Sequence, residues 1–193
     1  MESKQGRPII AFASPADWEQ WLTTNHETAP GLWVKIAKKG AGIDSVTYAE
    51  VLDGALCYGW IDGQKASFDE QFWLQRFTPR GRHSKWSQIN RDKVAELMRQ
   101  DRMKPAGLAQ VERAQQDGRW DAAYPPQSRI TVPDDLQVAL DDNPAARANF
   151  DQLDRLNRYA ILYRLHDTRN PETRARRIDH FVAMLAENQK PYP

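Results

Sequence analysis

Apolar residues recur along the first two-thirds of the chain with two different spacings, which predict helices and strands in mixed order. Apolar positions three and four apart predict helices, and short β-branched or aromatic runs between turn residues predict strands. The expected helices start at Ser14, Thr47, Ser84 and Pro105, and the expected strands cover residues 9–12, 32–37, 60–68 and 72–77. The last two strands predict an antiparallel hairpin. Adjacent strands without regular alternation indicate an α+β fold with a small antiparallel sheet.

The helix that starts at Thr47 has the clearest local signals for both of its ends. Thr47 and Glu50 stand three residues apart, the spacing of a capping box in which each side chain accepts from the other's backbone amide. Gly59 follows the apolar stripe at the position where a left-handed residue ends a helix, a conformation that glycine adopts without strain. Gly54 interrupts the stripe and allows another part of the chain to approach closely.

The last third of the chain predicts helices only. A segment with two consecutive prolines and few apolar anchors, residues 121–133, is typical of a surface linker. After it, helices are expected from Pro133, from Asn143, over residues 156–165 and from Asn170. The pattern therefore predicts an α+β domain over residues 1–120, a linker over 121–133 and a helical module over 134–193.

Composition indicates a cytoplasmic protein with a core of ordinary size. Apolar residues make up 40% of the chain and charged residues 27%. The single cysteine, Cys57, excludes an internal disulfide and favours a reducing compartment. No apolar run approaches the roughly 18 residues of a membrane span. Because Cys57 lies among apolar helix residues without a nearby base, a buried structural thiol is favoured over a nucleophile.

Several longer motifs occur in order along the chain. They are ALCYGWIDG at residues 55–63, RFTPR at 76–80, SKWSQIN at 84–90, RMKPAG at 102–107 and PETRARRI at 171–178. In these motifs the chain resembles the YdeI/OmpD-associated family of bacterial proteins, also called the bacteriocin-protection family. The resemblance covers nearly the whole chain.

The resemblance implies a fold and a cellular context but no reaction. It implies a YjbR/CyaY-like (frataxin-like) N-terminal domain, with helices on one face of a small antiparallel sheet, and an OmpD-associated C-terminal helical module. It also implies a role in bacteriocin protection and stress response without an agreed catalytic residue. Iron binding is not carried over, because the region of the first helix holds only the acids Asp17, Glu19 and Glu27. The four histidines are scattered, so no metal or cofactor is expected.

Positive charge is concentrated between Arg76 and Lys104. This stretch holds nine basic and three acidic residues, a local charge of +6 in a chain whose total is +1. With Phe77 and Trp86 interleaved, it is suited to a phosphate, a nucleotide or another polyanion. The alternative is a solvated helix face whose charges pair with acids elsewhere. Nucleic acid is a less favoured partner because the pI is only about 7.9.

These observations predict a cleft that binds an anionic ligand or partner. Its expected residues are Trp60, Asp62, Lys65, Arg76, Arg80, Lys85 and Trp86, with the cations holding the anion and the indoles stacking a planar part. The leading prediction is a non-catalytic binding protein. The alternatives are a small-molecule enzyme that uses Asp62 as acid or base, and a weak nucleic-acid binder. Asp62 before Gly63 is also typical of a turn without a function, and the turn is the favoured interpretation.

A second basic cluster occupies the first turns of the last expected helix. Arg174, Arg176 and Arg177 lie near the helix N-terminus, where the helix dipole disfavours positive charge. The cluster therefore predicts a docking surface for a protein partner or for the N-terminal domain.

Overall fold

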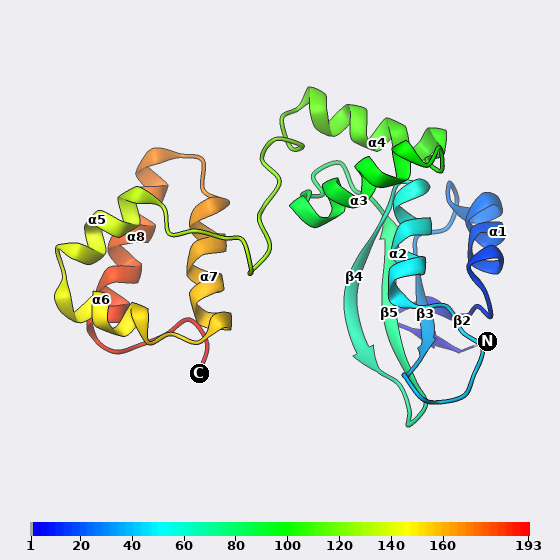
Figure 1. Ribbon diagram of the computed structural model, residues 1–193, viewed down its shortest axis with the longest axis horizontal. Helices are drawn as coiled ribbons and strands as arrows, with labels where there is room; N and C mark the ends of the chain where they lie inside the picture. The colour runs from blue at the N-terminus through cyan, green and yellow to red at the C-terminus, as the bar shows by residue number, and fades with distance from the viewer. Residues whose placement is uncertain (1) are drawn as a thin grey trace. The chain divides into compact units, whose positions relative to one another are not determined.

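The computed structural model describes residues 2–193 and divides into two compact units, the first ending at Ala123 and the second running from Tyr124 to Pro193 (Figure 1). The first residue of the predicted N-terminal domain lies outside the described residues. Each unit has an apolar core of its own. The first unit is mixed α and β, as the sequence predicts, and each unit is described separately below.

In its described residues the first unit contains five strands and four helices. The strands are β1 (Ser3–Lys4), β2 (Arg7–Ala11), β3 (Leu32–Ala37), β4 (Trp60–Ser67) and β5 (Phe72–Pro79), and the helices are α1 (Pro15–Asn25), α2 (Tyr48–Cys57), α3 (Gln88–Arg99) and α4 (Pro105–Gln116). Figure 1 shows α1 and α2 beside the sheet on one side. This arrangement gives the unit a helical layer and a sheet layer with the core between them.

The strands form one sheet in the order β1-β2-β3-β5-β4. β4 and β5 pair antiparallel, so the predicted hairpin is confirmed. The expectation of a wholly antiparallel sheet is wrong, because β2 pairs with β3 in parallel. The physical reason is that α1 connects β2 to β3, and a helical crossover between neighbouring strands returns the chain in the same direction.

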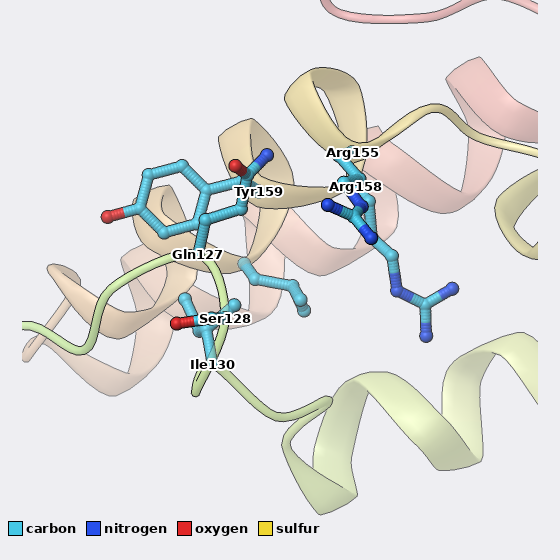
Figure 2. A pocket seen from close by; sticks show the side chains of 7 residues that line it. Gln127, Ser128, Ile130, Arg155, Arg158 and Tyr159 are labelled. Atoms are coloured by element: carbon cyan, nitrogen blue, oxygen red, sulfur yellow. The ribbon is translucent and has the colours of Figure 1, made fainter.

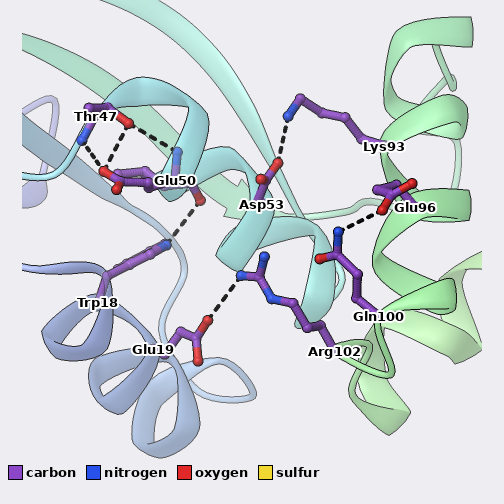
Figure 3. A network of polar contacts seen from close by, with 10 residues as sticks. Trp18, Glu19, Thr47, Glu50, Asp53, Lys93, Glu96, Gln100 and Arg102 are labelled. Atoms are coloured by element: carbon purple, nitrogen blue, oxygen red, sulfur yellow. Dashed lines mark hydrogen bonds and ion pairs between the residues drawn. The ribbon is translucent and has the colours of Figure 1, made fainter.

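Helix α2 lies at the centre of the first unit, and side chains of α1 and α3 bind to it. Both halves of the capping box are present: the Thr47 hydroxyl accepts from the Glu50 amide at 3.3 Å and the Glu50 carboxylate accepts from the Thr47 amide at 2.8 Å. The Trp18 indole of α1 donates to the Val51 carbonyl at 3.0 Å. Lys93 of α3 forms an ion pair with Asp53 at 2.6 Å (Figure 3).

The ends of the helices confirm most of the predicted caps and correct one of them. The N-caps Ser14 and Thr47 are confirmed, and Gly59 has the expected positive φ of 75°. The expected start of α3 at Ser84 is wrong, because Ser87 caps the helix and its hydroxyl accepts from the Asn90 amide. Ser84 instead accepts from the Gly81 amide at 2.9 Å, which closes the preceding loop.

Alternation along the strands assigns side chains to the two faces of the sheet. Phe77 of β5 belongs to the core under the helices, so its neighbour Arg76 lies on the opposite face. Pairing partners on adjacent strands share a face. Asp62 pairs with Phe77 and Lys65 pairs with Gln75, which places both β4 residues on the helix face. A β-bulge between Asp62 and Lys65 keeps them on this face although they are three residues apart.

The second unit contains helices α5 (Asp134–Asp141), α6 (Pro144–Asp151), α7 (Arg155–His166) and α8 (Pro171–Ala186). Prolines at the first positions of α6 and α8 follow the asparagine caps Asn143 and Asn170, both of which accept from the amide three residues later. All four helices bury apolar side chains in one common core, which includes Leu136, Phe150, Ile161, Leu165 and Phe181.

Candidate functional site

Trp60 lies in the core of the first unit and not in a cleft. Its side chain is 1% exposed and meets Trp18 and Trp21 edge-on, with ring centroids 6.5 and 5.7 Å away. The indole nitrogen donates to the His26 carbonyl at 3.1 Å. The expectation that this indole stacks on a ligand is therefore corrected, because both of its faces and its only donor are occupied by the protein.

Arg80 and Trp86 are buried against one another. The Arg80 guanidinium lies 3.5 Å from the Trp86 ring centroid and donates to the Lys85 carbonyl at 3.2 Å. Trp120 meets Trp86 at 4.9 Å between centroids. Because Arg80 is 5% exposed and Trp86 2% exposed, this pair holds the loop between β5 and α3 in place instead of facing solvent.

The predicted cleft residues fall into separate places in the fold. Arg76 lies on the sheet face opposite Asp62 and Lys65, beside Gly63, where an added Cβ would stand 3.0 Å from the Arg76 Nε. Of the predicted set, Asp62 and Lys65 lie together on the helix face of the sheet, next to the start of α2. The other predicted residues lie elsewhere in the first unit.

Around Lys65 the structure brings together a different group of cationic and aromatic side chains. We call it the lysine–tryptophan groove and define it by Lys38, Lys39, Tyr48, Lys65 and Trp73. Two hollows of about 710 and 600 Å³ adjoin here, and Lys38, Lys39 and Trp73 line both. Their volumes fall within the usual range for small-molecule sites.

Strand pairing positions the aromatic floor of the groove. Trp73 lies on β5 opposite Ile36 and Ser67, on the helix face. The Lys65 ammonium stands over the Trp73 ring at 4.5 Å from the centroid, and the Tyr48 ring lies 6.3 Å from that of Trp73. The Tyr48 hydroxyl donates to the Asp62 carboxylate at 2.9 Å, which ties the first turn of α2 to β4.

The loop after β3 positions the other two lysines. Lys38 donates from its ammonium to the Asp69 carbonyl at 2.8 Å and from its backbone amide to Gln71 at 2.7 Å. Gly40 then turns the chain with a φ of 87°, a conformation that favours glycine. Lys39 is exposed, and within residues 2–193 its side chain forms no hydrogen bond or ion pair. Asp44 is the one acidic residue that lines the hollows, so the groove is cationic.

The sequence reading missed Trp73, Tyr48 and the Lys38–Lys39 pair. The two lysines follow the expected strand over residues 32–37, and Trp73 lies within the expected strand over residues 72–77. The available signal was the alternation along residues 72–77, which puts Trp73 on the same face as Phe77. Locating Lys65 above Trp73 required the bulge in β4, which has no sequence signature here.

Cys57 is a buried structural thiol, as expected. Its side chain is 2% exposed at the end of α2. Burial raises the pKa of the Cys57 thiol to about 11, with the Arg102 charge acting in the opposite direction. The thiol is therefore protonated at neutral pH and does not serve as a nucleophile.

We expect Cys57 to resist alkylation by iodoacetamide at pH 8 in the native protein and to react fully in 6 M guanidinium. The thiolate is the reactive form. Burial keeps the reagent away from the sulfur, and the raised pKa keeps the thiol protonated at pH 8. Because the folded pKa is the higher one, the stability linked to this thiol is present below about pH 9 and declines as the pH rises towards 11. Intact-mass spectrometry after timed labelling measures the reaction. Native labelling as fast as unfolded labelling would contradict the expectation.

Two of the arginines in the basic cluster of α8 are used inside the second unit. Arg174 forms two hydrogen bonds with the Asp135 carboxylate and donates to the Leu165 carbonyl. The Arg174 hydrogen bonds hold the pKa of Asp135 below its usual value. Arg177 donates to the Arg164 carbonyl at 2.9 Å. The cluster thus connects α8 to α5 and α7, while partner binding by Arg174, Arg176 and Arg177 stays a prediction.

Among residues 2–193, none of the helices combines the length and apolar composition needed to cross a lipid bilayer. In the same residues, no three His, Cys, Asp or Glu side chains gather in a way that would hold a metal ion.

Two family models match the chain. Residues 10–110 match the model described as "Domain of unknown function (DUF8412)", and residues 129–188 match the model described as "Bacteriocin-protection, YdeI or OmpD-Associated". The expected resemblance to the YdeI/OmpD-associated family is confirmed for the second region. Over the first region the matching model is DUF8412, and the YjbR/CyaY-like assignment stays a prediction. No curated protein and no solved structure matches the chain.

Proposed function

Because this chain belongs to the DUF8412 family, whose description assigns no activity, we propose its function from the lysine–tryptophan groove. The protein is a non-catalytic binding protein whose groove takes an anionic small molecule with a planar part, such as a nucleotide. This proposal keeps the predicted function and moves its site from the original cleft to the groove around Lys65.

One observation carries the proposal: three lysines surround a partly exposed tryptophan at two adjoining hollows. Ammonium groups attract phosphate or carboxylate groups, and an indole face accepts a planar ring. Lys65 already stands over the Trp73 ring, so a ligand ring that displaces it leaves the ammonium beside the ligand's anionic group. Lys39 is available for a second charge contact.

The match of residues 129–188 to the bacteriocin-protection family supports a role in bacteriocin protection or stress response. We place this role in the cytoplasm, consistent with a single buried cysteine. The frataxin-like arrangement of the first unit and the purely helical character of the C-terminal module belong to the same proposal. Four helices in the second unit support the latter.

We expect ATP to raise the melting temperature of the first unit at low salt. A ligand at 100 times its dissociation constant stabilises a protein by about 2.7 kcal/mol, which moves a melting temperature by several degrees. Tripolyphosphate, an anion without a ring, and adenosine, a ring without the anion, should each bind at least about tenfold more weakly than ATP. Differential scanning fluorimetry, followed by calorimetric titration, measures these affinities.

Two double variants are compared. The test variant combines Lys39→Gln with Lys65→Gln, and the control combines Lys104→Gln with Lys190→Gln. Each pair removes the same charge, but only the first lies at the groove, so only the first should weaken ATP binding by about tenfold or more. Equal loss in both pairs would show general charge attraction and not a site. Binding of an oligonucleotide alone, with affinity falling steeply as salt increases, would favour the nucleic-acid alternative.

A further inference from the structure

The second unit contains a pocket of about 370 Å³ between the segment before α5 and the first turns of α7. Figure 2 shows Arg155 and Arg158 on one side of it, with Tyr159 and Gln127 on the other. Ser128, Ile130 and Leu162 complete the lining. The pocket lies far along the chain from the lysine–tryptophan groove and shares no residue with it.

The two arginines of the pocket, Arg155 and Arg158, have only one distant acidic partner between them. Arg158 lies over the Phe150 ring, 4.4 Å from its centroid, and reaches the Asp151 carboxylate only at 4.0 Å. Arg155 is exposed, and its side chain forms no hydrogen bond or ion pair within the described residues. Arg147 of the neighbouring helix behaves differently, because it pairs with both Asp141 and Asp151. An arginine that lacks such an acid retains its donors for a ligand.

The opposite wall is rigid and amphipathic. The Tyr159 hydroxyl donates to the Pro125 carbonyl at 3.2 Å, which fixes its ring beside the pocket. Burial raises the pKa of Tyr159, so the phenol stays neutral at physiological pH. The side chains of Gln127 and Ser128 form no hydrogen bond within residues 2–193, so an amide and a hydroxyl of the pocket lining can pair with a polar group of a bound ligand.

The start of α7 does not itself provide the attraction. The Asp154 carboxylate already accepts from the Asn157 amide and from the Asn157 side chain, both at 2.8 Å. This cap satisfies the helix end and adds a negative charge there. Any anion in the pocket is therefore held by the guanidinium groups. Their attraction for the anion must exceed its repulsion by the Asp154 carboxylate.

We propose that this pocket binds a small organic anion, with its carboxylate or phosphate group between Arg155 and Arg158 and its apolar or aromatic body against Tyr159. Ile130 and Leu162 provide apolar contacts for that body. Polar groups at one end and an apolar wall at the other are the usual composition of a small-molecule site. Two guanidinium groups provide forked donors that match the oxygens of either anion.

The experiment is a titration of the ¹⁵N-labelled full chain with phenyl phosphate and, separately, with benzoate, followed by amide chemical shifts. The expected result is a set of shifts confined to residues 127–130 and 155–162, with a dissociation constant of about 1 mM or lower for at least one of the two acids. The stronger ligand identifies phosphate or carboxylate as the preferred group. Inorganic phosphate and phenol, which each provide half of the ligand, should bind at least about fivefold more weakly.

Arg155→Gln tests the site with little risk to the fold, because the side chain is exposed and uncommitted. It should weaken binding about tenfold or more. Arg169→Gln is the matched control: it removes the same charge from the same unit beyond the other end of α7, and its affinity should stay within twofold of the native protein. No shift from either acid, phenol binding as well as phenyl phosphate, or equal weakening in both variants would overturn the proposal.

Discussion

Replacing Trp18 by alanine is expected to destabilise the first unit by about 3–5 kcal/mol, the usual cost of removing a large buried aromatic side chain. Trp18 is fully buried and contacts the rings of Phe12, Trp21, Trp60 and Phe77. Its indole also donates to the carbonyl of Val51 at the centre of α2. The substitution therefore leaves a cavity and also removes a buried hydrogen bond between α1 and α2.

Guanidinium denaturation followed by near-ultraviolet circular dichroism measures the effect, because all seven tryptophans lie in the first unit. Ile89→Ala is the matched control, since that large apolar side chain is 44% exposed on α3 and its loss should cost about 0.5 kcal/mol or less. A denaturation midpoint for Trp18→Ala equal to that of the control would contradict the packing described here.

Replacing Gly107 by alanine is expected to destabilise the first unit by about 3 kcal/mol, although it adds a single methyl group. The new Cβ would overlap the Cys57 carbonyl oxygen and lie 2.8 Å from the Leu56 carbonyl oxygen. These are backbone atoms at the end of α2, so no side-chain rotation can relieve the clash. The Lys104 amide also donates to the Cys57 carbonyl at 3.1 Å, which holds α4 against α2 at this point.

Gly81→Ala is the matched control for this substitution. A Cβ at Gly81 would meet only the Ser84 hydroxyl oxygen at 3.6 Å, an ordinary contact. Thermal melts of both variants should show a normal transition for Gly81→Ala and a transition lower by several degrees for Gly107→Ala. Coincident melting curves would mean that α4 does not pack on α2 as closely as the structure shows.

The close approach of the chain to Gly54 shows how far a local signal extends. The glycine in the apolar stripe of α2 predicts that some part of the chain comes near, and the ring of Trp18 does so: an added Cβ would stand 2.9 Å from two ring atoms. The sequence does not specify which segment makes this approach, because Trp18 is 36 residues away in the chain.

The sequence predicted the chemical character of the proposed site but not its position in the fold. The cationic and aromatic character expected of the cleft recurs in the proposed groove, and strand pairing places Lys65 and Asp62 on the same face of the sheet. Arg76 was misplaced because a single step along β5 moves a side chain to the other face. Trp60 and Trp86 were expected to bind a ligand because the sequence does not distinguish a buried tryptophan from an exposed one.

By itself the sequence determined those features that depend on neighbours three or four residues away. The caps at Ser14 and Thr47 and the stop at Gly59 follow from such contacts, and the β4–β5 hairpin and the α+β class follow from the order of elements along the chain. Only the tertiary structure decided the parallel pairing of β2 with β3, the face of each strand residue and the gathering of Lys38, Lys65 and Trp73. These depend on pairing between segments distant in the chain, where burial of the whole core, and not local preference, selects the arrangement.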